Sequence, residues 1–379
     1  MKIDTITIRE LSMRLKAPYE TSAGTEWNRR ILLVQVSSDG LSGWGEVTVD
    51  QTPSFTSETT DTAWHILSDF LVPMILGKTV SGGKEAGTLM HFIRGHEMAR
   101  GAVENAIWDI EAQQNNLPLG RLLGGTLKEI PCGVALGIQP TLEVLLERIS
   151  EELAVGYQRI KLKIKPGQDV AIVEQVRRVF PEIALMVDGN SAYRLEDVAV
   201  FERLDDFRLM MIEQPLWWDG ILDHSKLQAV LRTPICLDEC IRNPHLAEEA
   251  IELNACRVMN IKLGRVGGHS AARQIHDLCV KSGIPAWCGG MLESGIGRAH
   301  NIAMSTLPGF VLPGDVSASH RYWHEDIIEP EVEVFSNGTI RIPKTAGLGY
   351  NVRSERVEQL TVRSRTWKDV NRVSIAGVE

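Results

Sequence analysis

The sequence predicts an α/β protein whose middle part closes into a barrel of parallel strands, next to a smaller antiparallel region. Three observations predict this fold. Short apolar runs alternate with amphipathic helical stretches from about residue 130 to about residue 315. Polar residues end several of these runs at a nearly constant spacing. The glycine-rich turn G-x-G-x-x-G, expected of an open doubly wound sheet, occurs nowhere in the sequence.

Residues 1 to about 50 predict a meander of antiparallel strands. The segments ITIREL, ILLVQVSS and GLSGWGEVTV carry the strand patterns, and Ser-Asp-Gly at 38–40 supplies the last turn. The polar stretch APYETSAGTEWN at 17–28 and the segment 49–55 show no period, so we expect loops there. Between 100 and 114, apolar residues recur at helical spacing. This first third of the chain is therefore expected to be α+β.

Eight apolar runs rich in Val, Ile, Leu and Met follow in the middle of the chain. They are PCGVALGI, RIKLKI, IALMVDGN, LMMIEQP, TPICLDE, CRVMNIKLG, IPAWCGG and GFVLPGD. Continuously apolar strands separated by helices indicate a parallel sheet that is covered on both faces.

The polar residues that end five of these runs are evenly spaced. Lys163, Asp188, Glu213, Asp238 and Lys262 are separated by 25, 25, 25 and 24 residues. The same step carried backwards and forwards falls within the first, seventh and eighth runs. About 25 residues suffice for one strand, one helix and two short loops, so eight such units predict a (β/α) barrel.

In such a barrel the carboxyl ends of the strands form the active-site face. Asp188, Glu213 and Asp238 end three consecutive runs there. Carboxylates buried side by side are costly unless a cation neutralises them, so we expect these three to bind a metal. Their oxygen-only ligand set suits Mg²⁺, for which Mn²⁺ can substitute. The alternative, three unrelated solvated acids, is disfavoured by their equal register.

Lys163 and Lys262 end the two flanking runs, and Lys161 shares a strand face with Lys163. A neighbouring divalent cation disfavours the ammonium form, so we expect a lowered lysine pKa and a role as a base. Two lysines facing each other across a metal indicate removal of a proton α to a carboxylate, with an enediolate stabilised by the metal. Lysines that merely balance the acids are the alternative.

The charge and composition of the chain limit the classes of molecule that we expect it to bind. The 379 residues carry 40 Lys and Arg against 49 Asp and Glu, a formal charge of −9, without a long basic run. We expect a small-molecule carboxylate as the partner, and neither nucleic acid nor a membrane. No stretch has the length and apolarity of a membrane span, and no export signal is visible. Six cysteines without framework spacing predict reduced thiols in the cytoplasm.

Five short motifs resemble, in their order along the chain, those of the enolase superfamily, muconate-lactonizing subgroup. They are K-x-K at 161–163, VDGN, IEQP, LDE and NIKLGRVGG. The resemblance covers essentially the whole chain. It implies a modified TIM barrel, (β/α)7β, over 129–324, and an α+β capping domain over 1–128 that is completed by about 325–379. It also implies homo-oligomers, dimers or octamers, with Lys163 as the base and Lys262 as a cation that stabilises the enediolate.

The stretch WCGGMLESGIGRAH at 287–300 is similar to that of o-succinylbenzoate synthases and N-succinylamino acid racemases, as are Pro53, the segment 58–64 and Arg265. This resemblance implies syn dehydration of 2-succinyl-6-hydroxy-2,4-cyclohexadiene-1-carboxylate to o-succinylbenzoate, a step of menaquinone synthesis. In a racemase the two lysines would exchange protons with opposite faces of one carbon. The sequence does not separate the two activities.

Other enzymes of the superfamily provide the alternatives. Mandelate-racemase-like members place a histidine after the seventh strand, where this chain has Trp-Cys-Gly at 287–289. Dipeptide epimerases typically show D-x-D at the eighth strand, where this chain has Asp-Val-Ser at 315–317. Muconate cycloisomerases share the lysines and are the closest rival by chemistry, and further acid-sugar or amino-acid enzymes stay open. A catalytically inactive barrel that acts as a binding protein predicts decay of the strand-end groups, yet all five are present.

Substrate selection in this family is carried by the cap, so its two irregular loops and several strand ends are candidates for substrate contacts. The candidates are Tyr19, Thr21, Ser22, Thr52, Phe55, Asn190, Glu239, Arg265, Gly290, Met291 and Ser294. Gly290 and Ser294 are expected near the succinyl carboxylate. Trp27 and Phe55 could instead pack the cap onto the barrel.

Overall fold

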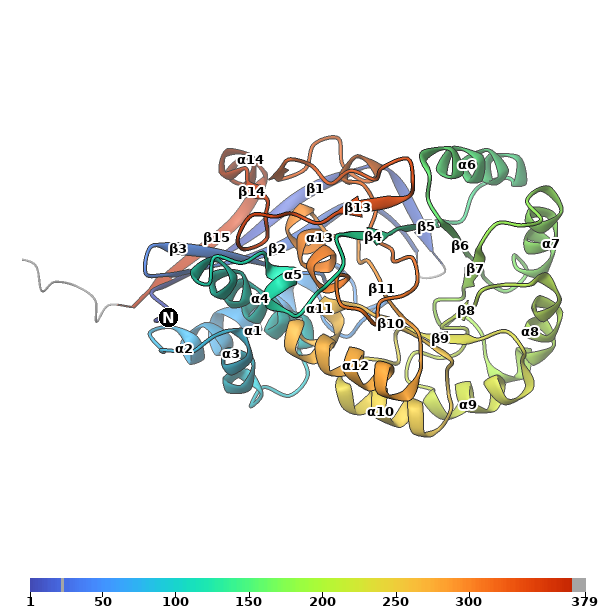
Figure 1. The fold of residues 1–379 in the computed structure, drawn as a ribbon, viewed down its shortest axis with the longest axis horizontal. Helices are drawn as coiled ribbons and strands as arrows, with labels where there is room; N and C mark the ends of the chain where they lie inside the picture. Colours follow the sequence, from blue (N-terminus) through green and yellow to red (C-terminus); the bar gives the residue numbers. More distant parts are fainter. Residues whose placement is uncertain (22–23, 370–379) are drawn as a thin grey trace, which may run out of the picture.

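The computed structural model describes residues 1–21 and 24–369. Figure 1 shows two parts side by side, a cap that contains both ends of the described chain and a ring of strands and helices from its middle. The ring is built on seven parallel strands whose order in the sheet follows the chain from β5 to β11. The predicted α/β barrel is therefore confirmed.

Each strand of the ring is followed by a helix on its outer side (Figure 1). The strands are β5 (Gly133–Leu136), β6 (Arg159–Lys163), β7 (Leu185–Asp188), β8 (Ile212–Glu213), β9 (Ile235–Leu237), β10 (Val258–Ile261) and β11 (Ala286–Cys288). The main helices are α6 (Leu142–Val155), α7 (Val170–Val179), α8 (Val198–Leu204), α9 (Ile221–Val230), α10 (Pro244–Glu252), α12 (His269–Ser282) and α13 (Gly295–Met304). Shorter helices are η2 (Leu195–Asp197), η3 (Asp205–Phe207), α11 (Leu263–Val266) and η4 (Ser319–Arg321).

The eighth apolar run closes the ring without becoming a regular strand. Phe310 makes an isolated parallel bridge to Ala286, and Gly314 makes one to Cys132. Pro313 lacks the N–H that a continuous ladder would need, which explains why only single bridges form. The Gly133 N–H still donates to the carbonyl of Gly314 at 2.7 Å, so this run joins the two edges of the seven-stranded sheet.

Local sequence signals set the helix boundaries. The Thr141 hydroxyl accepts a hydrogen bond from the Val144 N–H at the start of α6, and Gly156 ends that helix in the left-handed conformation, with φ of 112°. Asn243 caps α10 in the same way, with Pro244 at its first turn. These caps fix where α6 and α10 begin, and hence where the loops that precede them at the carboxyl ends of β5 and β9 run.

The cap contains an antiparallel sheet ordered β15-β1-β2-β3, so the last described strand pairs with the first. Its strands are β1 (Thr5–Thr21), β2 (Gly24–Ser38), β3 (Leu41–Val47) and β15 (Thr361–Lys368). Its helices are α1 (Thr60–Ile66), η1 (Leu67–Leu71), α2 (Val72–Ile75), α3 (Gly83–Met90), α4 (Glu97–Gln114) and α5 (Leu119–Leu122). Gly45 allows strand β3 to lie directly on α4, since a Cβ at this position would lie only 2.0 Å from the carbonyl oxygen of Ala102.

The prediction of a loop at residues 17–28 is wrong. Strand β1 continues to Thr21 and β2 resumes at Gly24, so most of this stretch is a long hairpin. The register shifts between Arg14 and Tyr19, which breaks the apolar alternation that sequence reading relies on. The hairpin reaches the barrel, where the Ile138 N–H donates to the carbonyl of Glu20 at 3.0 Å.

Short elements complete the described chain. They are β4 (Glu129–Pro131), β12 (Ile328–Glu329), β13 (Thr339–Arg341), β14 (Asn351–Val352) and α14 (Ser354–Leu360). All six cysteines are buried free thiols, as the sequence predicted. Among the described residues, we find no helix with the length and apolarity needed to cross a membrane.

Candidate active site

The inner face of β6 carries three basic residues. Alternate residues of a strand share one face, so Arg159, Lys161 and Lys163 point the same way, into the ring. Register brings acids beside them: Lys163 pairs with Asp188 of β7, and Asp188 pairs with Glu213 of β8. The regular strand spacing seen in the sequence thus becomes a row of charges at one end of the barrel.

Asp238 and Lys262 continue this row, since they directly follow β9 and β10. Asp188, Glu213 and Asp238 are each at most 1% exposed. Because strands β7 to β9 are neighbours, the three carboxylates lie between the lysine of β6 and the lysine after β10. This order is the one that the sequence predicted.

Lys161 is held by several acids at once. Its Nζ lies 2.9 Å from Glu213 Oε2, 3.4 Å from Asp188 Oδ2 and 2.5 Å from Asp315 Oδ2. The Nζ of Lys163 lies 2.6 Å from Asp188 Oδ2. The two lysines of the K-x-K motif therefore share one carboxylate.

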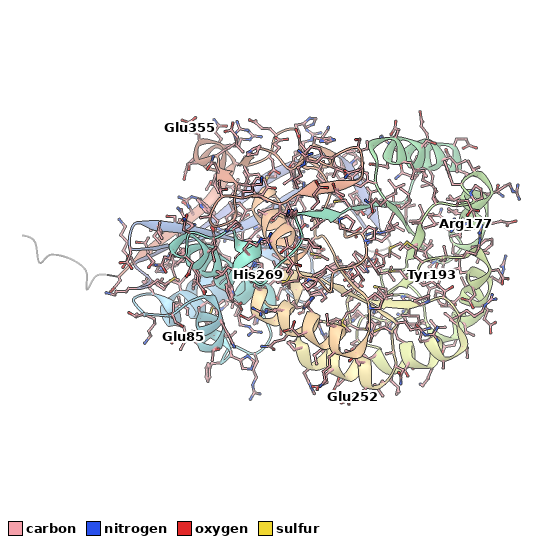
Figure 2. All side chains as sticks on the ribbon, viewed as in Figure 1. Glu85, Arg177, Tyr193, Glu252, His269 and Glu355 are labelled. Atoms are coloured by element: carbon pink, nitrogen blue, oxygen red, sulfur yellow. The ribbon has the colours of Figure 1, made fainter. Side chains whose placement is uncertain are left out.

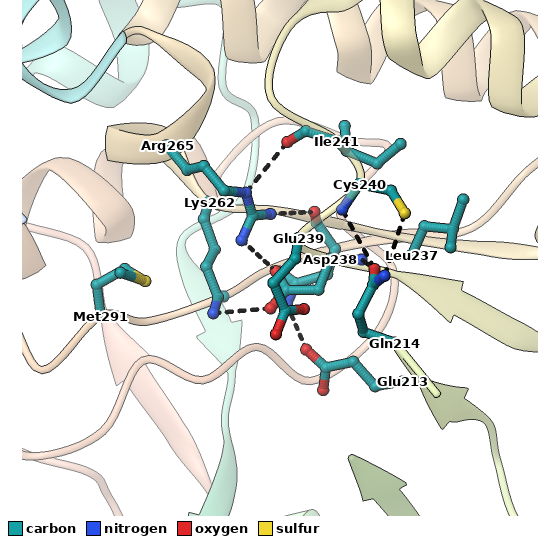
Figure 3. A network of polar contacts seen from close by, with 12 residues as sticks. Glu213, Gln214, Leu237, Asp238, Glu239, Cys240, Ile241, Lys262, Arg265 and Met291 are labelled. Atoms are coloured by element: carbon teal, nitrogen blue, oxygen red, sulfur yellow. Dashed lines mark hydrogen bonds and ion pairs between the residues drawn. The ribbon is translucent and has the colours of Figure 1, made fainter. Parts of the chain in front are cut away.

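Figure 3 shows the other half of the row, around Asp238. The Nζ of Lys262 lies 2.9 Å from Asp238 Oδ2, and Nη1 of Arg265 lies 2.5 Å from Asp238 Oδ1. The side-chain oxygen of Gln214 accepts hydrogen bonds from the backbone N–H groups of Asp238, at 3.0 Å, and Cys240, at 3.3 Å. The carboxylate and the backbone of Asp238 are thus both fixed.

The three acids differ in how their surroundings affect ionisation. Burial raises the pKa of Glu213 to about 7, and the neighbouring Asp188 adds to this. Burial also disfavours ionised Asp188, but Lys163 and Lys161 hold its pKa below the usual value. For Asp238, Arg265 and Lys262 outweigh burial, so its pKa is low as well. These acids perturb one another, which requires that they lie close together.

The acids of the site favour the charged forms of both lysines, whereas the lowered lysine pKa predicted above depends on a bound divalent cation and stays a prediction. Burial alone would lower the pKa of Lys163, but the carboxylate of Asp188 raises it above the usual value. The pKa of Lys161 is raised in the same way, against burial, by Asp315, Glu213 and Asp188. The physical reason is that the acids here face the lysines and favour their charged forms.

The donor set suits a hard cation. Across residues 1–21 and 24–369, no three His, Cys, Asp or Glu side chains already stand grouped for metal binding, and ammonium groups lie against the acids. However, Asp188, Glu213 and Asp238 offer oxygen ligands only, from three neighbouring strands. Asp238 disfavours ionised Asp188, and both aspartates disfavour ionised Glu213. Such a buried, mutually repelling set of carboxylates fits Mg²⁺.

A cavity of about 490 Å³ opens above this row, between the cap and the barrel. The predicted residues that line it are Tyr19, Thr52, Phe55, Lys161, Lys163, Asn190, Lys262, Gly290 and Met291. The ring of Phe55 lies 4.7 Å from the Nζ of Lys262, so this cap residue reaches the lysine. Trp27 lines the cavity too and is 56% exposed, rather than packed between cap and barrel.

Other predicted residues lie elsewhere. Glu239 and Arg265 do not line the cavity and are buried around Asp238. Ser294 is fully buried, and its hydroxyl donates to Glu46. For Thr21 only the backbone is described, paired with Gly24, and Ser22 falls outside the described residues.

Several residues at the site escaped sequence reading. Asn260 donates to Glu213 Oε1 at 2.7 Å. It lies on β10, two residues before Lys262, so strand alternation could have placed it on the same face as Lys262. Asp315 ends the eighth apolar run, and its carboxylate forms an ion pair with Lys161. Arg298, on α13, lines the cavity; it lies within the stretch 287–300 that carries the family resemblance but is not among the predicted site residues.

Comparisons with known proteins agree with this geometry. Residues 2–124 match the mandelate racemase / muconate lactonizing enzyme N-terminal domain, and residues 145–357 match the enolase C-terminal domain-like family. The chain is 51% identical to an o-succinylbenzoate synthase of Geobacillus kaustophilus, over 95% of this chain and 96% of that one.

Two further relatives match over nearly their whole length. An N-succinylamino acid racemase of Thermus thermophilus is 43% identical, over 96% of this chain and 99% of the relative. A solved structure from Listeria innocua, described as a member of the enolase superfamily, superposes with a TM-score of 0.94 at 38% identity, covering 97% of this chain and 99% of that one. Site geometry, domain matches and sequence identity together show that this chain belongs to the mandelate racemase / muconate lactonizing enzyme family of the enolase superfamily.

Proposed function

We propose that this chain is a Mg²⁺-dependent o-succinylbenzoate synthase of menaquinone synthesis that also racemises N-succinylamino acids. One observation carries the proposal. Lys163 and Lys262 line one cavity on either side of three buried carboxylates, in a chain that shares half of its residues with a synthase. Members of the superfamily typically use Mg²⁺.

The proposed metal ligands are Asp188, Glu213 and Asp238. When bound there, Mg²⁺ would hold the carboxylate of the substrate and stabilise negative charge on its oxygens. The carboxylate of Asp188 now raises the pKa of Lys163. An acid engaged in ligation would favour the lysine ammonium less, so Lys163 could lose its proton and act as the base.

The proposed dehydration starts at C1 of 2-succinyl-6-hydroxy-2,4-cyclohexadiene-1-carboxylate. Lys163 Nζ takes the proton from C1, next to the carboxylate, and the electron pair enters the enediolate. As this pair forms the C1–C6 double bond, the C6–O bond breaks. In a syn elimination the hydroxyl leaves from the face that Lys163 occupies, so Lys163 can return the proton and release water. Lys262, still charged, stabilises the enediolate.

Racemisation uses the same two lysines. Removal of the α proton of an N-succinylamino acid by one lysine and delivery by the other inverts the carbon, because the two approach from opposite faces. The similarity to the Thermus racemase supports this second activity. No extra group is needed beyond those of the dehydration.

An assay of the purified protein tests the proposal. With Mg²⁺ it should dehydrate the cyclohexadiene substrate and racemise N-succinylamino acids, and a chelator should abolish both until Mg²⁺ is restored. Asp188→Asn should weaken Mg²⁺ binding in a direct titration. If the protein turned over muconate but catalysed neither the dehydration nor the racemisation, the assigned function would be contradicted. The proposed enediolate chemistry would still be compatible with that result.

We also propose a cytoplasmic homo-oligomer, a dimer or an octamer, that acts on small carboxylates and not on nucleic acids or membranes. The six free thiols support a reducing compartment. The net charge of −9 disfavours polyanionic partners. Size-exclusion chromatography with light scattering measures the assembly directly.

A further inference from the structure

Arg298 differs from every other buried arginine of the described chain. Arg29, Arg159 and Arg265 each lie within 4 Å of a carboxylate oxygen. Arg298 is 2% exposed, and among the residues described here no carboxylate oxygen lies within 4 Å of its nitrogens. A cation that is buried without a counter-charge is costly, so such a group is retained where an anion can arrive to balance it.

The guanidinium of Arg298 is only partly satisfied by the protein. Nη2 donates to the backbone carbonyl of Glu293 at 3.0 Å, whereas Nη1 is buried and has no hydrogen-bond partner. The ring of Tyr322 lies 5.5 Å from the guanidinium carbon. Arg298 is therefore held in place by the wall while part of its hydrogen-bonding capacity remains unused.

Arg298 also belongs to the wall of the 490 Å³ cavity that contains Lys163 and Lys262. It lies on α13, which packs between the cap strand β3 and the barrel in Figure 1. A buried charge acts on a nearby anion through a low effective dielectric, even without direct contact. An anionic group in this cavity would therefore be stabilised by Arg298.

The other cations that line the cavity are already engaged. Arg29 pairs with Glu26 and Asp50. Lys161, Lys163 and Lys262 pair with the acids at the strand ends. These lysines and the proposed Mg²⁺ account for the carboxylate next to the reacting carbon. They leave the charge of Arg298 for a second carboxylate on the same ligand.

We propose that Arg298 is a specificity-determining residue that selects substrates whose distal part ends in a carboxylate. This inference rests on the proposed function, and it assigns to Arg298 the recognition of the succinyl arm. A neutral arm would leave the buried guanidinium without a counter-charge, and an arm ending in an ammonium group would be repelled. Arg298 thus disfavours substrates such as free dipeptides, whose distal end is cationic.

A matched pair of ligands tests this inference without turnover. The first is o-succinylbenzoate, and the second is the same molecule with the distal carboxylate replaced by a primary amide, which keeps the shape and removes the charge. Calorimetric titration of the wild-type protein with Mg²⁺ should show the acid binding about tenfold to a hundredfold more tightly, the usual effect of one charged hydrogen-bonding partner. Equal binding of the two compounds by the wild type would overturn the inference.

Variants then locate the source of the preference. Arg298→Met should reduce it to about twofold or less, while Arg298→Lys, which keeps the charge, should retain most of it. Arg321→Met is the matched control, because Arg321 lies 5.6 Å from the same Tyr322 ring but is paired with Glu152. A full preference in Arg298→Met, or its loss in Arg321→Met alone, would contradict the role of Arg298. Circular dichroism checks folding, and Arg298→Gln replaces the methionine variant if that variant fails to fold.

Failure of this inference is distinguishable from failure of the proposed function. A protein that dehydrates the cyclohexadiene substrate but binds acid and amide equally refutes only the role of Arg298. A protein that prefers the acid through Arg298 but catalyses neither reaction refutes only the proposed function.

Discussion

At the scale of single residues, Gln214 connects two of the proposed metal-binding strands. Its backbone has a positive φ of 33°, unusual for a residue other than glycine. The side chain accepts hydrogen bonds from the N–H groups of Asp238 and Cys240 (Figure 3). It also donates to the carbonyl of Leu216 at 3.3 Å. The residue after Glu213 thus fixes the backbone that presents Asp238.

We predict that Gln214→Leu weakens Mg²⁺ binding by about tenfold to a hundredfold, the usual cost of removing a group that orients a ligand. The reason is that Asp238 would lose its backbone anchor. Isothermal titration with Mg²⁺ measures the effect. Gln228→Leu is the matched control, because Gln228 accepts the Ile235 N–H at the opposite end of β9. Equal Mg²⁺ affinity in the two variants would contradict the positioning role of Gln214.

At the scale of elements, Glu46 links cap strand β3 to helix α13 of the barrel. Its carboxylate accepts hydrogen bonds from the backbone N–H groups of Ser294, at 3.0 Å, and Gly297, at 2.9 Å. An acid at the first turn of a helix is favourable, yet burial raises the pKa of Glu46 to about 7. The hydrogen bonds therefore offset only part of the cost of burying the charge.

This raised pKa predicts the direction of a pH effect on stability. The folded pKa of about 7 exceeds the unfolded value of 4.5. The stabilising contribution of protonated Glu46 is therefore complete below pH 4.5 and is lost as the pH rises through 7. Relative to Glu46→Gln, the wild type should lose up to roughly 3 kcal/mol of unfolding free energy between these pH values.

Urea unfolding at pH 4.5 and pH 7.5 checks this effect. Glu252→Gln, an exposed change at the end of α10 (Figure 2), is the control and should follow the wild type at both pH values. An identical pH dependence in Glu46→Gln and the wild type would contradict the assignment.

The elements also show where sequence reading succeeds and where it fails. Seven apolar runs become strands because helices cover the outer face of each strand and the barrel interior covers the other, which leaves a largely apolar signal in the sequence. The sequence does not predict the hairpin at residues 17–28, because this hairpin lacks a buried face of its own along much of its length. The eighth run was recognised, but Pro313 limits it to isolated bridges.

At the scale of the whole molecule, the row of charged residues at the strand ends could be predicted from the sequence. In a parallel barrel, residues that end successive strands at a constant spacing lie together at one end of the barrel. Lys163, Asp188 and Glu213 are direct partners in the sheet, which makes sequence spacing equivalent to spatial proximity. The cavity wall follows no such rule. Arg298 reaches it from α13, and Trp27 and Phe55 reach it from the cap. Contacts between parts that are distant along the chain depend on docking, so the sequence indicates candidates such as Phe55 only through the family resemblance.

In the proposed mechanism, Lys163 removes the proton α to the substrate carboxylate. The most direct measurement is exchange of the α proton of an N-succinylamino acid in deuterated water with Mg²⁺, followed by NMR. For the enantiomer whose proton faces Lys163, Lys163→Ala should slow exchange at least about a hundredfold, as expected for loss of a general base. Mg²⁺ binding and folding should be retained. Exchange that persists at the wild-type rate for both enantiomers in Lys163→Ala would contradict the account.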